Sequence, residues 1–260
     1  MNATSKGSKM PSPIKIVLFA TLFTSTALLT MFQPIWANIP LNIIIPVLLL
    51  LFMEMVFFER LKLTTLICMR ILVVVTIFGL FSGATCVKIV LILWMINILE
   101  ATLTDLSKKH YLNAVTGLAL TISLFTFFTK ENLSAWNGVY YTLLYNGNIG
   151  TICWIIAYTL WNWVFVSYDF SPAIAKFHIA ILSAPIIGSL ITMNPGVWFI
   201  LRGNSLTTGG ITEIAFKKKL EPSLQSSHMT NFVNGTHKFS VQLSVMILNL
   251  LLIALPAFLL

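Results

Sequence analysis

Residues 87–104 read VKIVLILWMINILEATLT, a stretch of eighteen residues that is almost continuously apolar. A helix of this length covers a hydrocarbon core about 30 Å thick. Inside a bilayer only helices and closed barrels satisfy every backbone hydrogen bond, and barrel strands would show alternating segments of about ten residues instead. The stretch therefore predicts a transmembrane helix.

Seven further apolar runs surround this one, at residues 14–36, 39–58, 63–81, 111–128, 148–167, 173–193 and 241–260. The 260 residues are 57% hydrophobic and 9% charged, with a mean hydropathy of +0.90. Soluble domains carry about 25% charged residues, so a soluble fold is excluded. We expect residues 1–260 to form a single integral membrane domain, an all-α polytopic transmembrane helix bundle.

The distribution of lysine and arginine predicts the orientation of the bundle. The N-terminal lysines, Arg60 with Lys62, and Lys108 with Lys109 fall on one side when the helices alternate. This places the short N-terminal tail, residues 1–13, in the cytoplasm. Residues 217–219, all lysine, join that side only if residues 197–216 also cross. We therefore expect about nine spans, eight of them clear and one polar or re-entrant and shielded by its neighbours.

The net charge of +8 arises from short basic clusters between apolar runs. This is the positive-inside pattern and not a nucleic-acid footprint, so the expected partner is the lipid bilayer, with a small solute or ion as the candidate ligand. The first run is too long for a signal peptide and no small-residue cleavage site follows it. A bacterial inner (plasma) membrane is the default location.

Two connections are longer than the rest. Residues 129–147 are predicted to be extracytoplasmic, and their aromatic side chains, Trp136, Tyr140, Tyr141 and Tyr145, are typical of an interfacial anchor or, alternatively, a substrate-gripping lid. Residues 217–238 are predicted to form a polar cytoplasmic loop. Cys68, Cys86 and Cys153 lie in or beside apolar runs without ligand spacing, and we expect them to be buried structural cysteines.

The run at residues 87–104 contains the densest group of polar side chains. Asn97, Glu100 and Thr104 are spaced i, i+3, i+7 and so share one helix face, which we expect to point into the bundle. Asp105 follows one residue beyond, and Asn113 on the next helix is expected to face Glu100 or Asp105. Glu100 is either a proton carrier, cation ligand or general base, or a structural anchor between helices.

The run at residues 148–167 contains an aromatic stripe. Trp154, Tyr158 and Trp161 stand at i, i+4, i+7, with Asn162 beside them. Such a stripe is typical of packing, and the alternative is a pocket or a cation path.

Three further sites have weaker support. Glu54 and Arg70 are candidates for an ion pair, and His178 for a structural hydrogen bond. Pro46, Pro185 and Pro195 are expected to kink or end helices and to free backbone carbonyls, which matters only beside a cavity. The chain has no Walker A loop, GxSxG elbow, HExxH motif or paired metal-ligand spacing, so no cofactor or metal is expected.

Three motifs resemble a family of prokaryotic multi-pass membrane proteins known as a domain of unknown function. They are Asn97-Ile-Leu-Glu100-Ala with Asp105 after it, Leu112-Asn113-Ala-Val-Thr-Gly117, and Trp154-Ile-Ile-Ala-Tyr158-Thr-Leu-Trp161-Asn162. The similarity covers about residues 94–190. It implies a span near residues 197–216 and supplies no activity. An acidic residue is frequent in the family where this chain has Thr159, so no carboxylate role is implied there.

Three classes of function remain open. The first is transport or conduction of a small solute or ion, with Asn97, Glu100, Tyr158 and Asn162 lining the path. The second is an intramembrane enzyme acting on a lipid or isoprenoid, with Glu100 and Asp105 as acid and base. The third is a non-catalytic sensor or assembly partner. Transport is the favoured hypothesis, and an enzyme is the less favoured one.

Overall fold

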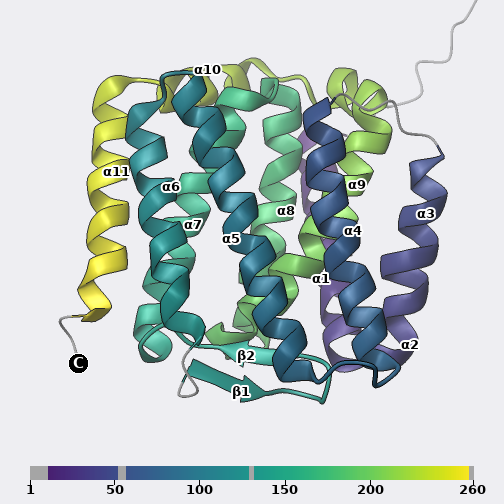
Figure 1. The fold of residues 1–260 in the computed structure, drawn as a ribbon. Coiled ribbons are helices and arrows are strands. Elements are labelled where there is room, and N and C mark those ends of the chain that lie inside the picture. Colours follow the sequence, from purple (N-terminus) through teal and green to yellow (C-terminus); the bar gives the residue numbers. More distant parts are fainter. Residues whose placement is uncertain (1–10, 52–56, 129–131, 258–260) are drawn as a thin grey trace, which may run out of the picture.

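A computed structural model of the protein describes residues 11–51, 57–128 and 132–257. Most of the helices stand side by side as an upright bundle (Figure 1). They are α1 (Ser12–Phe32), α2 (Pro34–Ile39), the π-helix η1 (Pro40–Ile44), α3 (Ile45–Leu50), α4 (Phe57–Ile77), α5 (Gly83–Ser107), α6 (Tyr111–Ser123), η2 (Leu124–Phe128), α7 (Gly147–Asp169), α8 (Pro172–Ile191), η4 (Pro195–Val197), α9 (Trp198–Leu224), α10 (Ser227–Thr236), α11 (Phe239–Ala254) and η5 (Leu255–Ala257).

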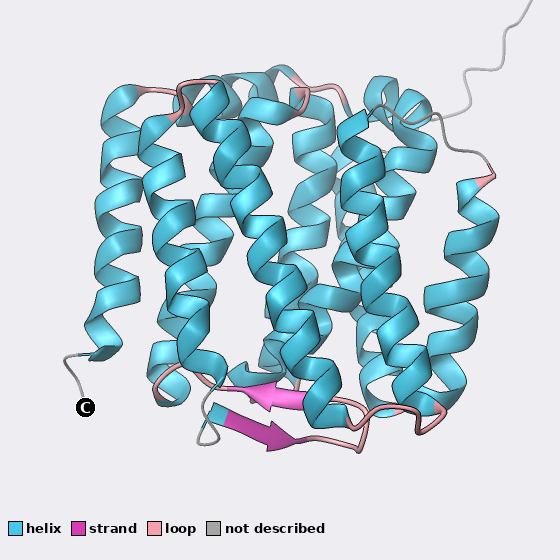
Figure 2. Ribbon diagram, viewed as in Figure 1, coloured by secondary structure: helices cyan, strands magenta, loops and turns pink. Residues whose placement is uncertain are grey.

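The two ends of the bundle are closed differently (Figure 2). At one end α10 lies across the helices. At the other, β1 (Leu133–Ala135) and β2 (Tyr141–Leu143) form an antiparallel hairpin in which Leu133 faces Leu143. The segment 217–238, predicted as a loop, is instead mostly helical, because α9 continues to Leu224 and α10 follows it.

Five of the described helices are long and apolar enough to span a membrane: α1, α5, α6 extended by η2, α7 and α8. A sixth span results if α10 and α11, which meet at a 66° bend, count as one. The other predicted spans fall short for local reasons. The second is divided into α2, η1 and α3, and α9 carries many polar residues. In α4 the fully described part, Leu66–Ile77, is apolar but too short to span by itself.

The outer surface of the bundle is apolar, as a lipid-facing surface must be. Val17 on α1, Ile71 on α4, Ile122 on α6 and Leu251 on α11 are each more than half exposed. Cys68 on α4 is also exposed, so it is not the buried cysteine that we expected, whereas Cys86 and Cys153 are buried.

Lysines gather at the end of the bundle that α10 covers. Lys15 donates to the Ser223 carbonyl at 3.2 Å, which joins the start of α1 to the end of α9. Lys176 at the start of α8 donates to Ser12 Oγ at 2.7 Å. Lys108 forms a 2.7 Å ion pair with Asp169 at the end of α7. The basic residues thus tie several helix ends together on one side.

Pro185 interrupts the backbone hydrogen bonds of α8. It has no N–H, so the carbonyl of Ile181 four residues earlier loses its helical partner. Arg202 Nη1 and Ser205 Oγ, both on α9, lie 3.4 and 3.3 Å from that carbonyl oxygen. Side chains of α9 therefore replace the missing backbone donor, and this locks α8 to α9.

We expect Ser205→Ala to lower the free energy of unfolding by about 1 kcal/mol, typical of a lost interhelical hydrogen bond. In a Pro185→Ala background the new backbone N–H of residue 185 can reach Ile181, so the same change should cost less. A double-mutant cycle measured by SDS unfolding in bicelles tests this. Equal costs in both backgrounds would contradict the assignment.

Candidate functional site

The predicted polar stripe of α5 lies beside its buried face rather than on it. Asn97, Glu100 and Thr104 are half-buried. The residues of α5 that point into the bundle are instead Leu91, Trp94, Met95, Ile98, Ala101, Thr102 and Asp105. Aromatic and aliphatic packing, not the polar stripe, sets the rotation of the helix, and the expectation that the stripe faces the interior is corrected accordingly.

Asp105 is completely buried and anchors a polar cluster at the end that α10 covers. Asn113 Nδ2 donates to Asp105 Oδ2 at 2.7 Å, so Asn113 reaches one of its two expected partners. His110 Nδ1 lies 3.4 Å from Asp105 Oδ1. The His110 ring stacks on Tyr168, which stacks in turn on His237, with ring centroids 3.7 and 4.0 Å apart.

The aromatic stripe of α7 is packed in the main hydrophobic core. Trp154, Tyr158 and Trp161 are at most 1% exposed. Trp154 contacts Phe127, Tyr158 contacts Trp198, and Trp161 packs between Tyr158 and Phe165. None of them lines the cavities described below. Asn162 is half-buried and its Oδ1 lies 3.5 Å from Arg202 Nη2, while the Arg202 guanidinium lies 5.6 Å from the Tyr158 ring centre.

A second polar group, centred on Arg70 of α4, lies deep in the bundle. Arg70 is 6% exposed. Its Nε donates to Thr207 Oγ1 at 2.8 Å, its Nη1 to Asn204 Oδ1 at 2.8 Å, and its Nη2 to the Gly203 carbonyl. All three acceptors are neutral and belong to α9. Among the side chains that the structure describes, which exclude those of residues 52–65, no carboxylate lies within 4 Å of this guanidinium. Glu54, its predicted ion-pair partner, lies outside the described residues.

Asparagines extend the Arg70 group to two further elements. Asn42 of the π-helix η1 donates from Nδ2 to Asn204 Oδ1 at 3.0 Å and to Asn38 Oδ1 at 2.7 Å. The Tyr140 hydroxyl, from the hairpin segment, donates to the same Asn38 oxygen at 2.8 Å. Burial raises the pKa of the Tyr140 phenol, so this hydroxyl stays protonated and remains a donor.

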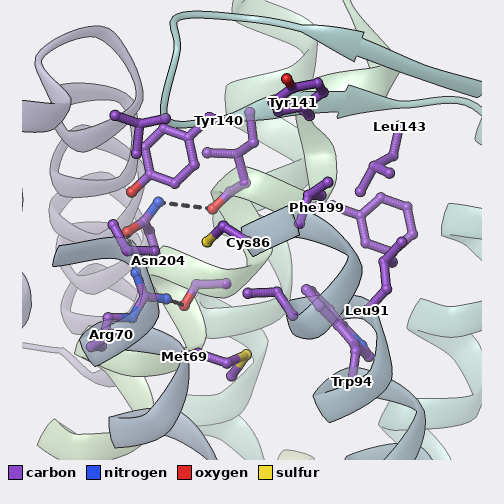
Figure 3. A pocket seen from close by; sticks show the side chains of 16 residues that line it. Met69, Arg70, Cys86, Leu91, Trp94, Tyr140, Tyr141, Leu143, Phe199 and Asn204 are labelled. Atoms are coloured by element: carbon purple, nitrogen blue, oxygen red, sulfur yellow. Dashed lines mark hydrogen bonds between the residues drawn. The ribbon is translucent and has the colours of Figure 1, made fainter. Parts of the chain in front are cut away.

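Two cavities meet at Arg70. The first, of about 60 Å³, lies beneath the hairpin and is lined by Arg70, Asn204, Tyr140, Cys86 and surrounding apolar side chains (Figure 3). The second, of about 310 Å³, is lined by residues of η1, α3, α4 and α9. Tyr140 is 8% and Tyr145 is 5% exposed. These two tyrosines therefore point into the protein and are not the interfacial anchor that we expected.

A buried arginine that has no carboxylate partner among the described side chains is costly. An arginine near the centre of a membrane costs about 2.5 to 3.5 kcal/mol on insertion scales, and neutral hydrogen-bond acceptors offset only part of the lost hydration. An anion drawn to the guanidinium would offset more, because Coulomb attraction is strong at low dielectric. The Arg70 group therefore has the chemistry of an anion site.

His178 of α8 and Glu213 of α9 form another buried polar pair. His178 Nδ1 of α8 lies 3.0 Å from Glu213 Oε2 of α9, so His178 is paired and does not lie alone at an interface. In the described part of the chain no three His, Cys, Asp or Glu residues are grouped to hold a metal ion.

The sequence indicated Arg70 only as half of an ion pair. It did not identify Asn38, Asn42 or Tyr140 as hydrogen-bonding members of a buried polar group. A signal was present, because Asn38 and Asn42 share a helix face at i, i+4 inside an apolar run. Asn204, Thr207 and Glu213 similarly marked 197–216 as a segment whose polar face needs partners.

Comparison of the chain with protein-family models, curated proteins and solved structures gave no significant match. The fold and the apolar surface define the class. The protein is an all-helical protein with five to six apolar helices that can span a membrane, and it encloses a polar group around a buried arginine.

We expect the stability of the protein to fall as the pH is lowered from about 7.5 to 5.5, in part because of His110. Burial lowers the pKa of this imidazole below its ordinary value. The unfolded chain therefore binds a proton that the folded chain resists, and stability is lost as the pH falls through the unfolded pKa. The slope of unfolding free energy against pH should be smaller in His110→Gln, and unchanged in His228→Gln, an exposed position on α10. An unchanged slope in His110→Gln would refute this.

Proposed function

We propose that the protein is a nine-span membrane transporter or channel that binds a small anion at Arg70 and passes it between the two cavities. The observation that carries this is the buried guanidinium, whose acceptors among the described side chains and backbone are all neutral and which lines both cavities at once. An intramembrane ionisable residue is a functional candidate by default. The site differs from the one expected at Glu100.

The path has two parts. The first cavity lies under the hairpin, on the side away from the lysine-rich end, and includes Tyr140 and Asn204. The second continues along α4 past Arg70 to Ile71 and Val74. The Arg70 guanidinium lines both cavities. An anion can therefore move from one cavity to the other while it stays paired with the same residue.

Two observations support nine spans, and the distribution of lysines supports a cytoplasmic lysine-rich end. The helices α3, α4, α9 and α11 stand alongside the five apolar ones (Figure 1). Four polar side chains in the first part of α9, Arg202, Asn204, Thr207 and Glu213, are at most 5% exposed, so they are shielded from lipid. The positive-inside rule then orients the lysines toward the cytoplasm.

The enzyme hypothesis has less support. It requires Glu100 and Asp105 to converge, yet Asp105 is fully buried with Asn113 and His110, while Glu100 lies half-buried on a different face of α5.

Cysteine labelling tests the topology. In a variant with the native cysteines replaced, Ser107→Cys and Ser227→Cys should react with an impermeant maleimide only after the cells are permeabilised. Ser134→Cys and Met193→Cys should react in intact cells. Residues 193 and 227 flank α9, so labelling of both from one side would show that α9 does not cross.

Electrophysiology on proteoliposomes tests the function. Butanesulfonate is a suitable probe, because it stays ionised and does not cross lipid as a neutral acid. Wild-type protein should give a saturable current on a butanesulfonate jump. Arg70→Gln should reduce that current at least about tenfold, the equivalent of about 1.4 kcal/mol.

Two variants serve as controls for this measurement. Arg70→Lys keeps a positive charge in the bundle and should retain more current than Arg70→Gln. Lys108→Gln removes a cation at the bundle end and should behave as wild type. Equal currents in wild type and Arg70→Gln, with both eluting as monodisperse protein, would overturn the proposal.

A further inference from the structure

The second cavity changes in polarity from its mouth to its base. Val47 of α3 and Ile71 of α4, on its wall, are 52% and 56% exposed on the lipid-facing side. Asn42, Arg70 and Thr207, also on its wall, are at most 6% exposed. The exposed lining is therefore hydrocarbon, and the buried lining carries the charge and the hydrogen-bonding groups.

The exposed part of the lining, Val47 and Ile71, belongs to α3 and α4, so we infer that the mouth lies between these two helices. The lining comes from η1 and α3 on one side, α4 on another, and α9 behind them. The α3 helix stands at the edge of the bundle beside α4 (Figure 1). It follows a π-helix and contains Pro46, two features that prevent a straight helix from packing closely along α4.

The base of the cavity is suited to one negative charge. A guanidinium has five N–H groups, and three of those on Arg70 are used by Thr207, Asn204 and Gly203. Among the described side chains no carboxylate pairs with Arg70, so one anionic head group that reaches the guanidinium would gain a charge-assisted hydrogen bond. A phosphate dianion would bring a second charge for which the described residues here offer no cation.

We propose that the anion is a single-chain amphiphile with a monoanionic head, such as the carboxylate of a fatty acid, which enters sideways from the bilayer between α3 and α4. This rests on the proposed function and specifies its substrate class. The head pairs with Arg70, and the chain lies along the hydrocarbon wall and out through the mouth. The cavity volume of about 310 Å³ is at the lower end of the range for small-molecule pockets, and it houses the head and the first part of the chain.

Photolabelling in phosphatidylcholine nanodiscs tests this. The probe is hexadecanoate with a diazirine in its chain, used at alkaline pH so that the carboxylate is ionised. Peptides of η1, α3 and α4 should carry most of the label, and excess unlabelled hexadecanoate should remove it. Neutral methyl hexadecanoate should compete at least about tenfold less well, because it cannot pair with Arg70.

Mouth-filling variants provide the matched control. Ile71→Trp fills the mouth without overpacking the core and should abolish the label on α4. Ile122→Trp places the same side chain at a similarly exposed position of α6, 60% exposed, and should leave the label unchanged. Label spread evenly over the lipid-facing helices, or equal competition by acid and ester, would overturn the inference.

The two proposals fail separately. A butanesulfonate current that depends on Arg70, together with non-specific photolabelling, would overturn the amphiphile and leave the anion path standing. Specific labelling without any Arg70-dependent current would support the amphiphile site and overturn transport.

Discussion

The hydrogen bonds that Asn204 Oδ1 accepts from Arg70 and Asn42 are the interaction on which the interior depends. One amide oxygen joins α4, α9 and the π-helix η1, and through Asn38 it reaches the hairpin tyrosine. Hydrocarbon offers no hydrogen-bond partners, so a polar group inside the bundle has to be satisfied by the chain itself. The helices around Asn204 are therefore positioned by polar contacts, while those around the α7 aromatic core are positioned by packing.

The same constraint explains why α9 is central. A helix with an arginine, an asparagine and a glutamate cannot face lipid, so it lies where α4, α7 and α8 each supply a partner. Arg70, Asn162 and His178 are those partners. Pro185 frees the Ile181 carbonyl, which accepts hydrogen bonds from side chains of α9. Polarity that is unfavourable for an isolated span thus becomes the means by which the bundle is held together.

Much of the helical architecture follows from the sequence, because long apolar runs between short basic clusters admit one structural solution. The Asp105 to Asn113 contact was also within reach, because the two residues flank one short turn. The Arg70 group was not. Its hydrogen bonds join residues 134 and 162 positions apart, and that of Tyr140 spans 102, and no local pattern encodes such pairings. The predicted buried face of α5 was wrong because the prediction gave the polar stripe more weight than Trp94 and Ile98. The packing of these two residues determines which face is buried.

The acceptors of Arg70 have a mechanical consequence. Gly203, Asn204 and Thr207 lie within little more than one turn of α9, so a slide of α4 by even one residue, about 1.5 Å, would disturb all three bonds together. The two helices therefore behave as one rigid unit. The π-helix η1 is joined to the same unit by the bond from Asn42 to Asn204. Through that one amide oxygen, a shift of α4 would also reach the wall of the larger cavity that η1 forms.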